Sequence, residues 1–167
     1  MSSFLKDAQF VRHFPNKDDT GLLNVGYDNF KYVKPIKYFW VQENYALHFV
    51  LSGKGTLEIG GKTYSIKKGQ AFMIPCDEKM RYFPDENDPW EYVWFSLRSE
   101  FAKGYAEVLG FSVENPVIQC NKFTEMNIVL KNMFDALIED RGGYFTVLSA
   151  FYNILEMFVQ KNVTGIK

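Results

Sequence analysis

Histidine and cysteine are scarce in this sequence of 167 residues, which contains two of each. A divalent transition metal needs several imidazole, thiolate or carboxylate ligands that converge on one point, and His13 and His48 cannot supply them. Cys76 and Cys120 form only one possible pair, and the first residues lack the apolar core of a secretory signal. We therefore expect no metal, no cofactor and no disulfide framework, and a reducing, cytoplasmic location.

Net charge, long apolar runs and catalytic motifs are also missing. The chain carries 19 Lys and Arg against 20 Asp and Glu without a basic cluster, so a nucleic-acid-binding surface is not expected. No apolar stretch is long enough to cross a membrane. The sequence contains no G-x-S-x-G elbow, no Walker loop and no dinucleotide fingerprint. We therefore expect no enzymatic activity.

What the sequence does contain, over residues 22–98, is a series of short segments with alternating apolar residues. In TLEIGGKTYSI, Leu57 and Ile59 face one way, and Gly60-Gly61 can accept the positive φ of a type I′ hairpin turn. Such strands at this spacing predict a closed or sandwiched all-β unit. The runs VLSGKGTLEIGG and KKGQAFMIP resemble a cupin barrel. We expect a mainly β fold with helices, in which an N-terminal arm (residues 1–21) precedes a cupin-like (jelly-roll) barrel.

Cupins often hold a metal through two motifs, G-x5-H-x-H-x3–4-E-x6-G and G-x5-P-x-G-x2-H-x3-N. Residues 69–75 match the start of the second motif, but Met80 stands at its histidine position. In the first motif, Ala46 stands at the glutamate position, and Trp40 and Gln42 stand at the histidine positions. The resemblance therefore implies a cupin framework that has lost its metal ligands.

Helical periodicity replaces strand alternation after the barrel. Residues 99–120 are expected to form a short helix and a connection, and residues 121–163 an antiparallel pair of helices. The second of these, residues 144–160, is apolar over most of its girth and must be buried on more than one side. It is either sandwiched within its own domain or the seam of a homodimer. We favour the dimer, because so small a domain has little else to cover the second side. The dimer hypothesis selects Leu148, Phe151, Tyr152, Leu155 and Val159.

Aromatic residues make up 17% of the chain. In DPWEYVWFSL, strand alternation puts Trp90, Tyr92 and Trp94 on one face, which is expected to look into the barrel. The other face begins with Glu91 and is expected to start in solvent. The rings either fill the barrel or wall a cavity for a compact polar ligand such as a sugar, whose C–H faces stack on indole rings. We favour the cavity, with these candidate ligand-binding residues: Tyr38, Trp40, His48, Tyr82, Trp90, Tyr92 and Trp94.

The segment from Tyr45 to Leu97, with VLSGKG, Y-x-I-x-x-G-x-x-F-x-I-P and PW-x-Y-x-W, resembles the N-terminal ligand-binding domain of AraC-type (arabinose-regulator family) transcriptional regulators. The resemblance implies a metal-free cupin barrel that binds an effector, often a sugar, followed by helices that dimerise. An aromatic residue that stacks on the sugar matches Trp94, and two further pocket aromatics match Tyr92 and Tyr82. An arginine that contacts arabinose falls at Tyr38, which argues against arabinose itself.

The same resemblance implies an N-terminal arm, before about Gly26, that can fold over the ligand. It also implies a C-terminal pair of helix-turn-helix motifs, which this sequence does not include, so we expect an isolated sensor domain that contacts DNA only through that missing part. The expected partners are a small-molecule effector, in our hypothesis a carbohydrate, and a second copy of the chain. Two other functions stay open: a cupin enzyme such as a sugar isomerase or dioxygenase, and a stand-alone carbohydrate-binding module.

Overall fold

The chain divides into a β region and a helical region, as the sequence predicts. A computed structural model describes residues 3–14, 21–32, 34–35 and 38–159. Within these residues the elements are β1 (Gln9–His13), β2 (Leu22–Asn29), β3 (Tyr45–Ser52), β4 (Lys54–Ile59), β5 (Lys62–Lys67), β6 (Gln70–Ile74), β7 (Met80–Pro84), β8 (Glu91–Leu97), α1 (Ser99–Leu109), β9 (Val117–Gln119), α2 (Phe123–Ile138) and α3 (Tyr144–Phe158).

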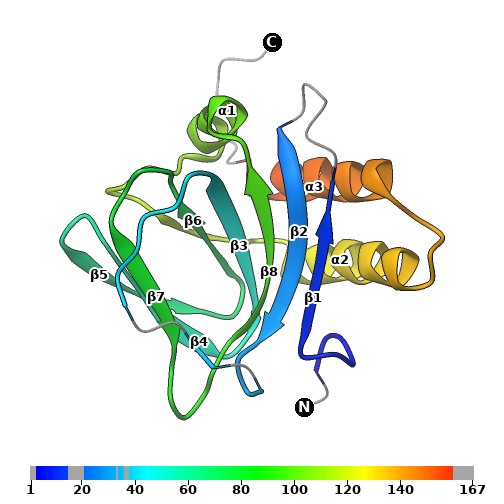
Figure 1. The fold of residues 1–167 in the computed structure, drawn as a ribbon, viewed down its shortest axis with the longest axis horizontal. Helices are drawn as coiled ribbons and strands as arrows, with labels where there is room; N and C mark the ends of the chain where they lie inside the picture. Colours follow the sequence, from blue (N-terminus) through cyan, green and yellow to red (C-terminus); the bar gives the residue numbers. More distant parts are fainter. Residues whose placement is uncertain (1–2, 15–20, 33, 36–37, 160–167) are drawn as a thin grey trace.

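The strands form two antiparallel sheets that face each other (Figure 1). One sheet has six strands in the order β1-β2-β8-β3-β6-β9, and the other has three in the order β5-β4-β7. The apolar core between them draws on both sheets, because one cluster of buried residues includes Leu57 of β4, Phe72 of β6 and Met80 of β7. The mainly β, cupin-like fold followed by helices is confirmed, although the two sheets stay separate and do not close into one barrel.

The glycine pair predicted to form a hairpin does so between β4 and β5. Ile59 pairs with Lys62 across the turn, and φ is 58° at Gly60 and 71° at Gly61. Positive φ at both central residues is the mark of a type I′ turn, whose twist matches the flanking strands. The turn fixes the register, so that Leu57 and Ile59 are both buried, as expected from their alternation.

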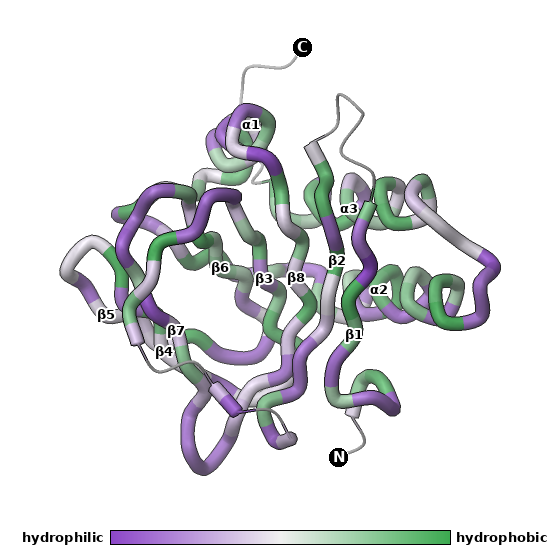
Figure 2. The backbone as a smooth tube through the Cα atoms, viewed as in Figure 1, coloured by the Kyte–Doolittle hydropathy of each residue, from purple (hydrophilic) through white to green (hydrophobic). Residues whose placement is uncertain are grey.

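Strand β8 separates two cores, because its alternate residues face opposite sides of the six-stranded sheet. Phe95 and Leu97 are buried on the helix side, where the Phe95 ring lies 5.1 Å from that of Phe151 in α3. Tyr92 and Trp94 belong to the cluster between the sheets. Figure 2 shows apolar and polar residues interleaved along the central strands, whereas the connection between α2 and α3 is polar. The alternation predicted for β8 is therefore confirmed.

Glu91 is the exception, because the face that it begins does not start in solvent. The residue is only 8% exposed. Its carboxylate accepts hydrogen bonds from the Phe4 backbone N–H (3.1 Å), the Tyr27 hydroxyl (2.5 Å), Asn29 Nδ2 (3.3 Å) and the Ser52 hydroxyl (2.9 Å). A buried carboxylate is tolerated when such donors replace its water. The expectation for this residue was wrong, and the carboxylate instead joins the N-terminal segment to the sheet.

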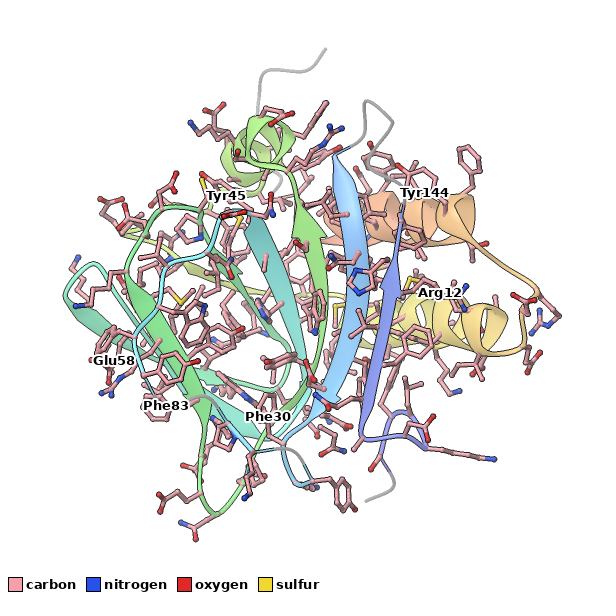
Figure 3. All side chains as sticks on the ribbon, in the orientation of Figure 1. Arg12, Phe30, Tyr45, Glu58, Phe83 and Tyr144 are labelled. Atoms are coloured by element: carbon pink, nitrogen blue, oxygen red, sulfur yellow. The ribbon has the colours of Figure 1, made fainter. Side chains whose placement is uncertain are left out.

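The N-terminal segment, expected to be an arm through residue 21, contributes the edge strand β1. All of β1 pairs with β2. On its helix side the Phe10 ring meets the Phe134 ring of α2 edge-on at 5.4 Å, and Arg12 donates a hydrogen bond to a main-chain carbonyl at the end of α2 (Figure 3). The loop expected here is therefore a strand, held by β2 and α2. Residues 15–20 of the predicted arm lie outside the described residues.

The helices begin and end close to the predicted positions. α1 ends at Gly110, whose φ of 79° is the left-handed conformation that glycine adopts readily at a helix end. Ser99 is the first helical residue, as the predicted start at residue 99 requires, and Arg98 precedes it at the N-cap position. The connection after α1 contains β9, which pairs with β6 at the edge of the sheet. α2 and α3 run antiparallel along the sheet beside β1 (Figure 1).

The burial of α3 corrects the dimer hypothesis at two positions. Phe151 has no exposed surface and Leu155 is buried, because both pack into the core between the helices and the six-stranded sheet. They are core residues of this chain, as the alternative of a helix sandwiched in its own domain requires, and neither exposes more than 8% of its surface. Leu148 and Val159 are partly buried against the same core, whereas Tyr152 is 42% exposed. The outward side of α3 therefore still presents apolar surface.

Candidate functional site

A cavity of about 450 Å³ lies between the two sheets, on the inner face of the six-stranded sheet. This volume is within the usual range for small-molecule sites. The residues around it come from β1, β2, β3, β7, β8 and the segment that precedes β3. They combine large aromatic rings with amide, hydroxyl and carboxylate groups.

Five of the seven predicted ligand-binding residues line this cavity: Trp40, His48, Tyr82, Tyr92 and Trp94. The strands β3, β7 and β8 and the segment before β3 carry them, so residues far apart in sequence meet at one place. Alternation along β8 predicted the inward direction of Tyr92 and Trp94. Their contact with a ligand stays a prediction.

Trp90 and Tyr38, the other two candidates, lie outside the lining. The Trp90 ring is fully buried, stacks on Phe72 at 5.4 Å and covers Gly55, where an added Cβ would come within 2.4 Å of it. It therefore fills the core between the sheets, which was the alternative explanation for these aromatics. Tyr38 is 68% exposed and meets Trp40 at a ring distance of 6.4 Å, on the outside of the cavity.

Trp94 lies flat against β2 because the residue beneath it is a glycine. Gly26 pairs with Trp94 in the register of β2 and β8, and a Cβ on Gly26 would lie 2.2 Å from the indole Cε2 and Cζ2. The indole Nε1 donates a 2.8 Å hydrogen bond to Oδ2 of Asp28. Gln9 of β1 donates a 2.6 Å bond from Nε2 to the other oxygen of that carboxylate. The ring plane of Trp94 is therefore fixed before any ligand arrives.

His48 is buried among aromatic rings. Its imidazole stacks on Phe72 at 4.4 Å and meets Tyr82 and Tyr92 edge-on at 5.1 and 4.9 Å. Burial lowers the pKa of His48 from the ordinary 6.5 to about 3, so the ring is neutral at physiological pH. Among the described residues, neither His48 Nδ1 nor Oδ1 of the cavity residue Asn24 has a hydrogen-bond partner. An unpaired buried polar atom is costly, and a ligand hydroxyl would relieve that cost.

Tyr82 and Tyr92 both line the cavity with their ring centres 6.3 Å apart, and each phenol influences the pKa of the other. Burial is the main cause that raises the pKa of both phenols above the ordinary value, and the negative charge of Asp28 adds to it. Both groups therefore stay protonated at physiological pH. Each can donate one hydrogen bond and accept others, which suits a ligand with several hydroxyls.

The segment before β3 holds Trp40 at the cavity through contacts on both sides. The backbones of Trp40 and Met80 exchange two hydrogen bonds, of 2.9 and 3.0 Å. The neighbouring Phe39 ring lies 4.7 Å from the guanidinium carbon of Arg81, which makes a two-pronged ion pair with Glu58 at 2.7 and 2.9 Å. Those hydrogen bonds lower the pKa of Glu58, which Figure 3 places on the outer side of the three-stranded sheet. Trp40 is thus positioned from outside the cavity.

Polar residues complete the lining, and none of them was among the candidate ligand-binding residues: Gln9, Asn24, Asp28, Lys34, Gln42 and Ser96. Alternation along β8 does turn Ser96 to the same face as Trp94. A signal for two of them exists in β2, where Asn24 and Asp28 alternate with the buried Val25 and Tyr27. Small and polar residues therefore take the face opposite to the apolar one, which marks a lined cavity and not a packed core. Gln9 has no such signal, because it reaches the cavity only through the pairing of β1 with β2.

Within the described residues, no three His, Cys, Asp or Glu side chains are grouped so that they could hold a metal ion. In the same part of the chain, no helix combines the length and apolarity that a membrane span requires. What the cavity offers a ligand is a pair of indole planes, neutral hydrogen-bonding groups and one carboxylate. This arrangement can stack on an apolar ring face and exchange hydrogen bonds with hydroxyl groups.

The comparison with known proteins gives three similar regulators. The Msm operon regulatory protein of Streptococcus mutans is 35% identical over 63 residues, which are 38% of this chain and 23% of that protein. The lactose operon transcription activator of Staphylococcus xylosus is 28% identical over 87 residues, which are 52% of this chain and 28% of that protein. The raffinose operon transcriptional regulatory protein RafR of Pediococcus pentosaceus is 31% identical over 58 residues, which are 34% of this chain and 21% of that protein.

The shared region is one part of these proteins, since the matches span 23%, 28% and 21% of their lengths. The sequence profile of the AraC-like ligand binding domain matches residues 38–144, which is more than half of this chain. That range contains all five predicted aromatic and histidine residues that line the cavity. The chain therefore belongs to the family of AraC-like ligand-binding domains.

Proposed function

We propose that this chain is the effector-sensing domain of a sugar-responsive transcription regulator, and that the cavity binds the sugar. The observation that carries the proposal is the cavity wall, where Gly26 and Asp28 fix the Trp94 plane beside the neutral hydrogen-bonding groups of His48 and Tyr92. A saccharide presents a ring face of C–H bonds and an edge of hydroxyls. The wall has a matching surface for each.

The relatives support a choice among sugars. Two of them are named for the lactose and raffinose operons. Both sugars contain a galactopyranosyl unit, whose axial C4 hydroxyl leaves one ring face with an uninterrupted run of C–H bonds. Such a face suits an indole plane. We therefore propose a saccharide that contains galactose as the effector.

The state of His48 favours binding over catalysis. Its Nδ1 has no partner among the described residues, so no carboxylate orients the ring as in a general-base pair. With a pKa of about 3, the ring is also a weak base at neutral pH. The transcription-regulator names of all three relatives agree with a sensor.

The test is isothermal titration calorimetry with lactose and raffinose, and with maltose as a control that lacks galactose. We expect the galactosides to bind, and Trp94→Ala to weaken binding about tenfold or more, because ring stacking with its burial is worth about 1.4 kcal/mol or more. Tyr38→Ala is the matched control, since it removes an exposed aromatic outside the lining. Unchanged affinity in Trp94→Ala would reject the site, and no binding of any saccharide would reject the ligand class.

The helices support a second copy of the chain as partner. Phe145 and Tyr152 on α3 are 80% and 42% exposed, and Ile128 on α2 is exposed as well. Phe145 and Tyr152 are seven positions apart and therefore share one side of α3, which we propose as the interaction surface. DNA would be contacted by another part of a longer regulator, which agrees with the small share of each relative that the chain matches.

The dimer proposal can be tested by sedimentation equilibrium. Phe145→Asp combined with Tyr152→Asp should give monomers, because two charges would be buried in the interface. Val108→Asp on α1 is the control, since it adds a charge to another exposed apolar position. A dimer that survives the double change would place the interface elsewhere.

A further inference from the structure

The charged groups of the cavity are few. Among its described lining residues, Asp28 is the one carboxylate and Lys34 the one ammonium group. Asp28 is half-buried on the inner face of β2 and accepts hydrogen bonds from Trp94 and Gln9. Both donors are neutral, so they hold the carboxylate in place without cancelling its charge. Lys34 is exposed to solvent.

The negative field of Asp28 reaches the buried part of the cavity. It adds to the burial that raises the pKa of both Tyr82 and Tyr92. No positive group in the described lining balances it there, because His48 is buried and neutral and the lining includes no arginine. An unpaired charge in such a low-dielectric site is costly.

Phosphate and carboxylate groups are bound in proteins by arginine and lysine side chains or by helix N-termini. The described lining comes from strands and from the segment before β3, and it offers only the exposed Lys34. An anionic ligand would therefore lose water and lie near Asp28 without a buried counter-charge.

We propose that Asp28 is a specificity-determining residue, which restricts the cavity to uncharged saccharides and rejects their phosphorylated and carboxylated derivatives. The inference rests on the proposed function, because it concerns the charge of the bound sugar. It also sets the place of the effector in a reaction sequence. The sugar must be supplied by a step that leaves it unphosphorylated, such as transport of the free sugar or hydrolysis of a larger saccharide. A kinase reaction that phosphorylates the sugar would convert it into a compound that the cavity no longer binds.

The test is calorimetric titration at neutral pH of galactose against galactose 6-phosphate and galacturonate. We expect each anion to bind wild-type protein about tenfold or more weakly than galactose. In Asp28→Asn, this difference in affinity between galactose and the anions should become about fivefold or more smaller. The charge is gone, while an amide oxygen can still accept the hydrogen bond from the Trp94 N–H. Glu58→Gln removes a carboxylate on the outer side of the three-stranded sheet, and it should show the same difference in affinity as wild-type protein.

Each other outcome has a definite meaning. An anion that binds as tightly as galactose, or a difference in affinity that Asp28→Asn leaves unchanged, overturns the inference but not sugar sensing. If neither galactose nor its anionic derivatives nor lactose binds, the proposed function fails and the inference fails with it. If Asp28→Asn does not fold, Asp28→Ser removes the charge with a smaller polar side chain and takes its place in the test. A difference in affinity between galactose and its anionic derivatives that Asp28→Ser leaves unchanged overturns the inference.

Discussion

Replacing His48 by glutamine tests whether the cavity holds a neutral histidine. Burial, the largest cause, lowers the pKa of His48 from 6.5 to about 3. The unfolded chain therefore takes up a proton below about pH 6.5, whereas the folded chain does so only below about pH 3. Between these limits the unfolded state binds more protons. The free energy of unfolding must then fall as the pH falls.

The magnitude follows from the size of the window. Each pH unit below 6.5 costs about 1.4 kcal/mol until the folded state also titrates. At pH 4.5, two units into the window, wild-type protein should have lost about 3 kcal/mol through His48, relative to pH 7.5. His48→Gln has no titrating group at this position and should not show this loss. The acid sensitivity due to the carboxylates is common to both proteins and cancels in their difference.

Urea unfolding at pH 7.5 and 4.5, followed by tryptophan fluorescence, measures both free energies. The difference in the free energy of unfolding between wild type and His48→Gln should shift by about 3 kcal/mol in favour of the variant at the lower pH. His13→Gln, which replaces the exposed histidine of β1, should follow the wild type. Parallel pH dependence of wild type and His48→Gln would refute the buried neutral histidine, and with it the hydrogen-bonding role we give this ring.

The remaining predictions concern the Trp94 ring and the core beneath α3. Gly26→Ala puts a methyl group 2.2 Å from the indole, so calorimetry should give about tenfold weaker lactose binding, whereas Gly104→Ala, with no atom within 4 Å, should bind as wild type. Equal affinity of the two variants would contradict the packing of Trp94. Phe151→Ala removes a fully buried ring and should lower the free energy of unfolding by about 3–5 kcal/mol in urea, against less than about 0.5 kcal/mol for Val108→Ala at an exposed position of α1. Equal losses would contradict the burial of Phe151 beneath α3.

The fold could be predicted from sequence because its signals are local. Gly60 and Gly61 determine the hairpin by their own conformational freedom, without help from distant residues. The direction of a strand residue follows from its odd or even position, which correctly turns Tyr92 and Trp94 inward and Phe95 toward the helices. These signals depend on a few neighbouring residues, and tertiary packing does not override them here.

The wrong predictions concern how deeply a side chain is buried and which other element covers it, and both depend on residues far away in sequence. Trp90 has the same inward direction as Tyr92, but its place along the strand puts it in the packed core instead of the cavity wall. Glu91 looks like a solvent residue, yet the donors that bury it come from as far as 87 positions away in sequence. Phe151 and Leu155 lie on a helix that is apolar on two sides, and periodicity does not tell which side the chain's own sheet covers.

The six-stranded sheet lies between the cavity and the helices. In two of its strands, one residue lines the cavity and the next residue packs toward a helix. In β8, Trp94 lines the cavity and Phe95 packs toward α3; in β1, Gln9 lines the cavity and Phe10 packs on α2. The carboxylate of Asp28 joins the two strands through its hydrogen bonds to Trp94 and Gln9. Contact alone does not establish coupling, because a sensor needs two arrangements with different ligand affinity. A ligand that shifted the Trp94 ring would also shift the Asp28 carboxylate that holds it, and with it the hydrogen bond from Gln9 of β1. The pairing of β1, β2 and β8 is therefore where we expect a ligand-dependent difference between two arrangements of the proposed sensor.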